Sequence, residues 1–110
     1  MDINVKRDAD RSIIEVSGDI DLYSSPKLRD TVLDLLGKRD QKSVIVNLSN
    51  VDYIDSSGVA SLVEGLQAAK KRSARFVLVG LKEGPRRVLE LTLLLNVFEV
   101  HATEEDALKA

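Results

Sequence analysis

Residues 50–66 read NVDYIDSSGVASLVEGL, and this stretch sets the expected fold. An aspartate, two serines and a glycine, Asp55–Gly58, stand between two apolar segments of different character. The preceding run SVIVNLSNV (43–51) is rich in β-branched residues, as expected for a strand buried on both faces. The following residues repeat at helical spacing, namely Val59, Leu62, Val63, Leu66 and Ala69. The stretch therefore predicts a buried strand followed by a helix that ends at about Arg72.

The chain before this stretch predicts a hairpin and a first helix. The apolar runs INV (3–5) and SIIEVSG (12–18) flank a turn-like segment at 8–11, which indicates an antiparallel pair. In the first helix Ser25 is the expected N-cap and Pro26 the first helical residue, where a missing N–H costs nothing. Four apolar residues follow at helical spacing before a terminating glycine: Leu28, Val32, Leu35, Leu36 and then Gly37.

The chain after the stretch continues the alternation of strand and helix. RFVLVG (75–80) predicts a buried strand, and Gly84-Pro85 opens a third helix that carries Val88, Leu89 and a run of leucines. VFEVH (97–101) predicts a last short strand, and Thr103 with Asp106 three residues later marks a terminal helix. We therefore expect one α/β domain over residues 1–110, with about four helices. Its mixed sheet should have four to five strands, open with a β-hairpin and become parallel.

Composition excludes several classes of function. The chain has 110 residues, of which 44% are hydrophobic and 31% charged, and a formal net charge of −2. This acidic balance, without a basic block, argues against nucleic-acid binding, and the absence of cysteine excludes disulfides and thiolate metal sites. The N-terminus lacks an apolar signal-like segment, and no run approaches 18 apolar residues. We expect a cytoplasmic protein without direct membrane insertion, free or in a membrane assembly.

Catalysis is not supported by the sequence. The single histidine, His101, lies at the end of a predicted strand, and no G-x-S-x-G elbow surrounds Ser56 or Ser57. No cluster of histidine and carboxylate residues has metal-ligand spacing, and the glycines form no nucleotide-binding fingerprint. We expect neither enzymatic activity nor a metal or cofactor.

The helix after Asp55 has an unusual second side. Opposite the apolar stripe lie mostly small residues: Ser57, Ala60, Ser61, Glu64, Gly65 and Ala68. A glycine within a helix costs about 1 kcal/mol relative to alanine, and such glycines often have a packing or functional reason. Either small residues are tolerated on a solvated face, or a partner's backbone approaches there. We favour a docking surface.

The start of this helix offers three candidate caps, Asp55, Ser56 and Ser57. At least one of them should accept hydrogen bonds from the free N–H groups of the first turn. A phosphate on a serine here would face the positive end of the helix dipole, so the fold would tolerate it. A partner docked over the helix tip would not tolerate the charge unless it offered a cation.

Three segments together resemble the STAS domains of bacterial anti-sigma factor antagonists over nearly the whole chain. These segments are GDIDLYSSPKLRD (18–30), VIVNLSNVDYIDSSGVASLVEGL (44–66) and RVLELTLLLNVFEVHATEEDAL (87–108). The combination of D-S-S-G after a buried strand with an upstream G-D-I-D is specific to this family.

The resemblance implies a partner-switching function. The serine after the aspartate, here Ser56, would be phosphorylated by a partner that is both anti-sigma factor and serine kinase. The unmodified chain would capture this kinase and release the sigma factor, and a PP2C-type phosphatase would restore the unmodified chain. The implied docking surface combines the loop before the first helix, here called the acidic loop because it holds Asp19 and Asp21, with the helix after Asp55. It comprises Asp19, Asp21, Asp55, Ser56, Ser57, Gly58 and the helix residues Ala60, Ser61, Glu64 and Gly65. Asp19 and Asp21 fit equally well a merely solvated acidic loop.

The sequence departs from the family pattern at two places. Thr92-Leu93-Leu94 stands where many members have Thr-Gly-Leu, and Gly58-Val59-Ala60 stands where some have Gly-Leu-Gly. Both departures concern the choice of partner rather than the fold. They leave open an alternative in which the chain is a STAS accessory subunit of a lipid-transporting ABC permease or an anion transporter.

Overall fold

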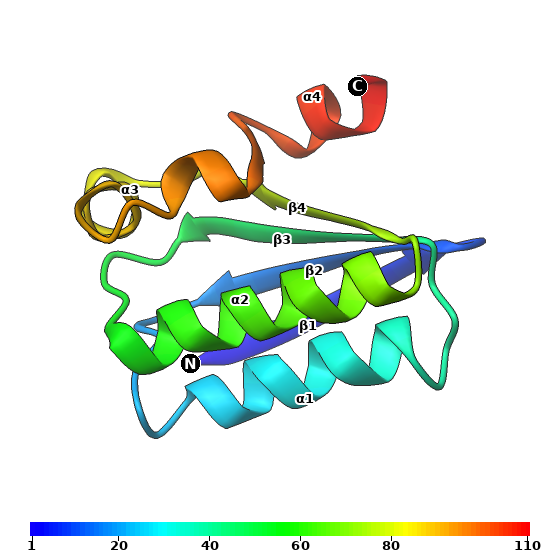
Figure 1. The fold of residues 1–110 in the computed structure, drawn as a ribbon, viewed down its shortest axis with the longest axis horizontal. Helices are drawn as coiled ribbons and strands as arrows, with labels where there is room; N and C mark the ends of the chain where they lie inside the picture. The colour runs from blue at the N-terminus through cyan, green and yellow to red at the C-terminus, as the bar shows by residue number, and fades with distance from the viewer.

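A computed structural model describes all residues, 1–110, and contains one five-stranded sheet in the order β1-β2-β3-β4-β5 (Figure 1). The opening hairpin pairs β1 (Asp2–Asp8) with β2 (Arg11–Ser17) in antiparallel register. The remaining strands, β3 (Ser43–Asn50), β4 (Arg75–Val79) and β5 (Glu99–His101), add in parallel register. The predicted mixed sheet that opens with a hairpin is therefore confirmed.

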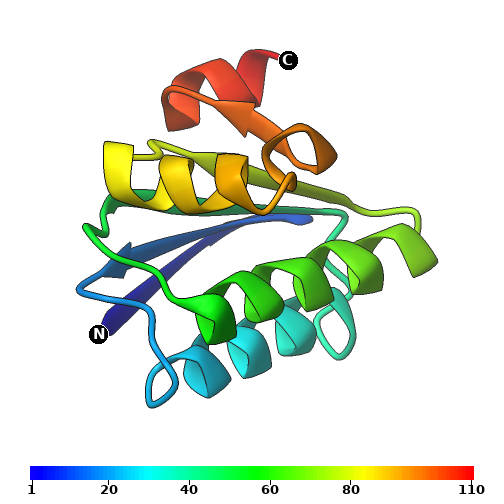
Figure 2. The ribbon, with the colours of Figure 1, turned by 60° about the vertical axis from the view of Figure 1, so that its left-hand side comes forward.

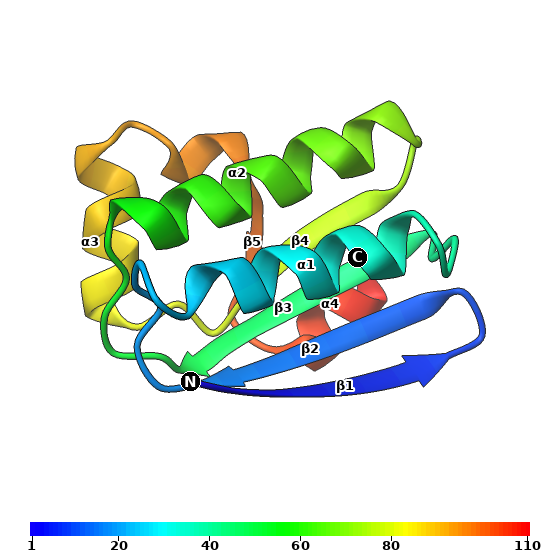
Figure 3. The ribbon, with the colours of Figure 1, turned by 90° about the horizontal axis from the view of Figure 1, so that it is seen from below.

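The helices cover the sheet unequally. The two long helices α1 (Ser25–Leu36) and α2 (Ser56–Lys71) lie side by side against one face (Figures 1 and 3). The short helix α4 (Glu104–Lys109) lies against the other face, and α3 (Glu83–Leu91) flanks α2 on the side away from α1 (Figure 2). A single 3₁₀ turn, η1 (Leu95–Val97), follows α3. No helix is both long and apolar enough to span a bilayer.

Burial follows from this layering. The main core lies between the sheet and the two long helices, and it includes Val44, Val46 and Leu78. A smaller apolar cluster on the opposite face joins Ile45 and Val77 to α4, with the remaining members Val79 and Ala107. The central strand β3 contributes to both clusters, which explains why its sequence is continuously apolar rather than alternating.

The start of α1 differs from the sequence prediction by one residue. The N-cap is Ser24, not Ser25, and the hydroxyl of Ser24 makes no hydrogen bond to the helix. Instead, this hydroxyl accepts a hydrogen bond from the backbone N–H of Asp21 at 2.9 Å. Ser25 is buried at 5% exposure because α2 packs over the first turn. A cap assigned from local sequence does not include this tertiary packing.

The third helix is shorter than its run of leucines suggests. It ends at Leu91, so Leu93 and Leu94 lie outside any helix and Leu95 begins η1. Leu93 adopts a left-handed conformation with φ of 60°, which turns the chain toward η1. The end of α1 at Gly37 and the cap of α4 by Thr103 are as predicted, whereas β1 extends beyond the predicted run 3–5 at both ends and includes Asp8 of the predicted turn.

Candidate partner-binding and phosphorylation site

Two loops at one end of the sheet form a single structural unit. Ile20, in the loop after β2, and Ile54, in the loop before α2, form a parallel bridge, and both side chains are buried. The N–H of Ile20 donates to the carbonyl of Tyr53 at 3.0 Å, and the N–H of Asp55 donates to the carbonyl of Ile20 at 3.1 Å. The acidic loop and the start of α2, which the resemblance assigned to one surface, are thus held together.

Asp55 joins the two loops through its side chain. One carboxylate oxygen accepts the N–H of Gly58 at 3.0 Å and caps α2. The other accepts the N–H of Leu22 in the acidic loop at 3.2 Å. The expectation that one of the three candidate residues caps the helix is confirmed. Because Asp55 fills this role, the fold does not depend on the hydroxyl of Ser56, which lies on an exposed residue at the helix tip.

Gly58 serves the packing of the two loops. A Cβ atom at this position would lie 2.9 Å from both the side chain and the carbonyl oxygen of Ile20, and it would also overlap Ile54. Any larger residue would therefore push the loops apart. Since Gly58 is buried, it supports the predicted docking surface from beneath rather than forming part of it.

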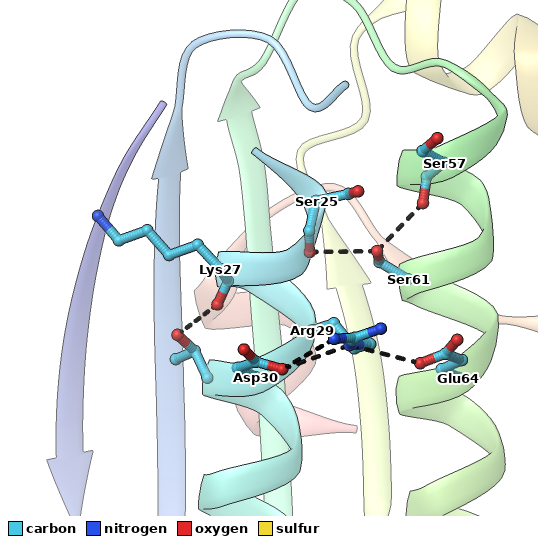
Figure 4. A network of polar contacts seen from close by, with 8 residues as sticks. Ser25, Lys27, Arg29, Asp30, Ser57, Ser61 and Glu64 are labelled. Carbon is cyan, nitrogen blue, oxygen red and sulfur yellow. Dashed lines mark hydrogen bonds and ion pairs between the residues drawn. The ribbon is translucent and has the colours of Figure 1, made fainter. Parts of the chain in front are cut away.

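The prediction that the small-residue side of α2 is exposed is wrong for two of its members. Ser61 is 6% exposed, and its hydroxyl lies 3.2 Å from the carbonyl oxygen of Ser25 in α1 (Figure 4). Gly65 is buried, and a Cβ there would lie 2.9 Å from the ring of Phe76 and 3.0 Å from Val32 of α1. The groups that approach this side belong to the chain itself, namely the carbonyl of Ser25 and the side chains of Val32 and Phe76. A helical wheel assumes that only one side of α2 is buried. The sheet and α1 together cover more than half of the surface of α2.

Two of the predicted contact residues on α2 do reach the surface. Ala60 and Glu64 are exposed, and Glu64 lies 3.8 Å from the guanidinium of Arg29 in α1 (Figure 4). Ser57 is half-buried, and its carbonyl oxygen accepts from the hydroxyl of Ser61 at 3.1 Å. The accessible part of α2 near the serines is therefore its first two turns.

The two aspartates of the acidic loop have different surroundings. Asp21 accepts hydrogen bonds from the N–H groups of Tyr23 and Ser24, each at 3.0 Å, and from the hydroxyl of Ser24 at 3.1 Å. The bonds from Ser24 hold the pKa of Asp21 below its usual range. Asp19 is exposed, and its side chain forms no hydrogen bond or ion pair within the chain. Asp21 therefore organises the loop, while the carboxylate of Asp19 is free to meet a partner.

Three exposed apolar side chains beside the serines were missed by the sequence analysis. Leu22 is 64% exposed, Tyr23 91% and Tyr53 53%. They belong to the two joined loops, one of which holds Asp19 while the other leads into Ser56. A signal was present in the sequence, because these residues fall in loops where no helical or strand periodicity assigns them to the core.

His101 takes part in a separate polar cluster on β4 and β5. Its ring nitrogen lies 2.8 Å from Glu99, which also pairs with the guanidinium of Arg75. The hydrogen bonds from Arg75 lower the pKa of Glu99 to about 2. His101 is thus paired with Glu99 and not with Ser56 or Ser57. No group of three or more metal-ligating side chains converges in the structure.

Comparison with known proteins agrees with this geometry. The family model of the STAS domain matches residues 2–107. The chain belongs to the STAS domain family. An anti-sigma-B factor antagonist of Listeria monocytogenes is 30% identical over 99 residues, which cover 90% of this chain and 86% of that protein. The predicted resemblance to the STAS-domain anti-sigma factor antagonists is therefore confirmed.

Solved structures share the STAS fold. An anti-sigma factor antagonist from Mycobacterium paratuberculosis superposes with a TM-score of 0.85 at 26% identity, covering 98% of this chain and 91% of that one. The phosphorylated form of the Bacillus cell fate determinant SpoIIAA superposes with a TM-score of 0.78 at 19% identity, covering 98% and 97%. The second likeness concerns the fold alone.

Proposed function

We propose that this STAS domain is a non-enzymatic anti-sigma factor antagonist that acts in the cytoplasm. In its unmodified form it binds an anti-sigma factor that is also a serine kinase, and the sigma factor is thereby released. The observation that carries the proposal is the exposed Ser56 at the tip of α2, next to an aspartate that already caps the helix. The name of the Listeria relative supports the same function.

The proposed contact surface lies around Ser56 on the two joined loops and the first turns of α2. It combines two acidic groups with exposed apolar side chains, as protein interfaces commonly do. Its members are Asp19, Leu22, Tyr23, Tyr53, Ser56, Ala60 and Glu64. Asp21, Asp55, Ser57 and Gly58 hold this surface in shape. The buried residues Ser61 and Gly65 form no part of it.

Phosphorylation of Ser56 is the proposed off switch. The phosphate would add about −1.5 to −2 charges at neutral pH. Within the chain, the free N–H groups and the dipole of α2 favour an anion at this end, so the fold should persist. At the interface, the phosphate would lie beside Asp55 and must lose its hydration when the partner docks. Binding should therefore weaken, and a PP2C-type phosphatase would reset the switch.

Phosphate transfer by the cognate kinase tests this proposal. The purified chain is incubated with the kinase and ATP, and the modified residue is located by mass spectrometry. We expect phosphate on Ser56, its loss in Ser56→Ala and its retention in the matched variant Ser57→Ala. Phosphate on Ser57 alone would reverse the assignment. If neither serine is modified and a permease is the bound partner, the accessory-subunit function replaces this one.

A further inference from the structure

The end of α3 adopts a capping motif that normally contains glycine. The N–H of Leu94 donates to the carbonyl of Leu89 at 2.8 Å, and the N–H of Leu93 donates to that of Glu90 at 3.1 Å. These two bonds define a Schellman motif in which Leu93 is the left-handed residue, with φ of 60°. Glycine is favoured there because it has no Cβ to clash with the backbone.

Leu93 is strained and contributes little to the core. Its side chain is 86% exposed, so burial of apolar surface does not offset the cost of the left-handed backbone. A glycine or asparagine would terminate α3 at lower cost. A strained, exposed leucine at a position that favours glycine indicates a contact outside the chain.

Two further exposed apolar residues lie within four positions of Leu93 in the sequence. Leu91 is 73% exposed and Val97 is 47% exposed. We call Leu91, Leu93 and Val97 the leucine patch. A shallow groove borders it, lined by Glu90, Leu93, Leu95 and Asn96.

Helix α3, which leads into the leucine patch, lies at the same end of the molecule as the start of α2 (Figures 1 and 3). The start of α3 contacts the loop before α2, since Lys82 pairs with Asp52 at 2.8 Å and Gly84 packs on the carbonyl of Asp52. The next residue in that loop is the exposed Tyr53. From there α3 runs for nine residues, about 14 Å, across the direction of α2, near the end at which α2 begins (Figure 3). Helix α3 therefore connects the loop that holds Tyr53 with the leucine patch.

The size of the patch argues against a stable dimer formed through it alone. A typical specific interface takes about 800 Å² and about 20–30 residues from each partner, far more than three side chains offer. A footprint of that size centred near Tyr53 would, however, include both Ser56 and the patch. We propose that the leucine patch is a second contact for the anti-sigma factor that docks over Ser56, with Leu93 inserted into an apolar hollow of that partner. This inference rests on the proposed function.

Replacement of Leu93 separates binding from stability. The variant Leu93→Gly relieves the backbone strain and should raise Tm by about 5 °C. The same variant should bind the purified serine-kinase anti-sigma factor of the same organism about tenfold more weakly in calorimetric titrations. Leu93→Met, which keeps an apolar side chain, should bind like the native chain. The matched control Leu108→Ala removes an exposed leucine on α4, against the other face of the sheet, and should leave affinity unchanged.

Each other outcome overturns the inference in a recognisable way. If Leu93→Gly binds normally while Ser56→Asp binds weakly, the patch is not a contact but the proposed function stands. If the native chain does not bind the anti-sigma factor, both proposals fail. A dimer in analytical ultracentrifugation, or sedimentation with phosphatidylcholine–phosphatidylglycerol vesicles, that is lost in Leu93→Gly would assign the patch to a second copy or to a membrane instead.

Discussion

The tip of α2 and its buried side contain the same kinds of residue in opposite roles. At the tip, Ser56 is exposed and makes no contribution to capping, because Asp55 caps the helix. Five and nine residues later, Ser61 and Gly65 are buried and allow α1 and Phe76 to approach closely. Small side chains in a helix therefore do not by themselves indicate a docking surface. The neighbouring elements determine whether small side chains are covered within the chain or remain accessible to a partner.

The largest expected effect tests this contrast between the buried and exposed sides. Gly65→Arg should destabilise the domain by about 3 kcal/mol or more, because no space exists between Val32 and Phe76 for a side chain. Ala60→Arg, at an exposed position of the same helix, should remain folded and weaken binding of the anti-sigma factor. Thermal melts and calorimetric titrations measure both effects. A folded Gly65→Arg domain with native stability would show that the two helices are not closely packed there.

The second prediction concerns the joint between the two loops. Asp55→Ala removes the acceptor for the N–H groups of Gly58 and Leu22 and should lower the free energy of unfolding by about 1–2 kcal/mol. Asp55→Asn retains one carbonyl oxygen for the cap and should lose less. Urea denaturation compares the two variants. Equal and negligible losses would mean that a serine can replace Asp55 as the cap.

The two aspartates of the acidic loop provide the third prediction. Asp19→Asn should slow association with the anti-sigma factor several-fold at low salt and weaken the salt dependence of the rate. Asp21→Asn keeps an oxygen for the bonds from Tyr23 and Ser24 but removes the negative charge that strengthens them, so it should lower Tm slightly and affect the rate through the shape of the loop. Stopped-flow measurements over a range of ionic strength distinguish the two. If Asp19→Asn associates at the native rate at every salt concentration, the carboxylate of Asp19 does not contribute to association.

The smallest effect lies far from Ser56, at the pair formed by Glu99 and Arg75. The pKa of Glu99 is lowered to about 2, so its pairing stabilises the fold above the ordinary pKa of a glutamate and is lost as the pH falls toward 2. Because glutamine does not titrate, the free energy of unfolding of Glu99→Gln should fall less between about pH 4.5 and about pH 2 than that of the native chain. The difference should be less than about 1 kcal/mol because the pair is partly exposed. Binding of the anti-sigma factor at neutral pH should not change. An unaltered pH profile would contradict this account of Glu99.

Local patterns were sufficient to predict the sheet and the four helices, and they limited the cap at the start of α2 to three residues. The β-branched run of β3 predicts its burial on both faces, and Asp55 has a side chain that is favoured at an N-cap. The surroundings of Ser61, Gly65 and Ser25 could not be predicted in this way. Their burial depends on how closely α1 and α2 pack, which a wheel of one helix does not contain. The strain at Leu93 likewise became visible only with the end of α3 in place.

The affinity of the anti-sigma factor for the two forms of this chain tests the central claim most directly. The chain is phosphorylated by the kinase, purified, and titrated beside the unmodified chain, with thermal melts to confirm that both are folded. We expect similar Tm values and an affinity of the phosphorylated form at least about tenfold lower, a difference of about 1.4 kcal/mol. Equal affinities of the two folded forms would contradict the proposal that Ser56 is the switch.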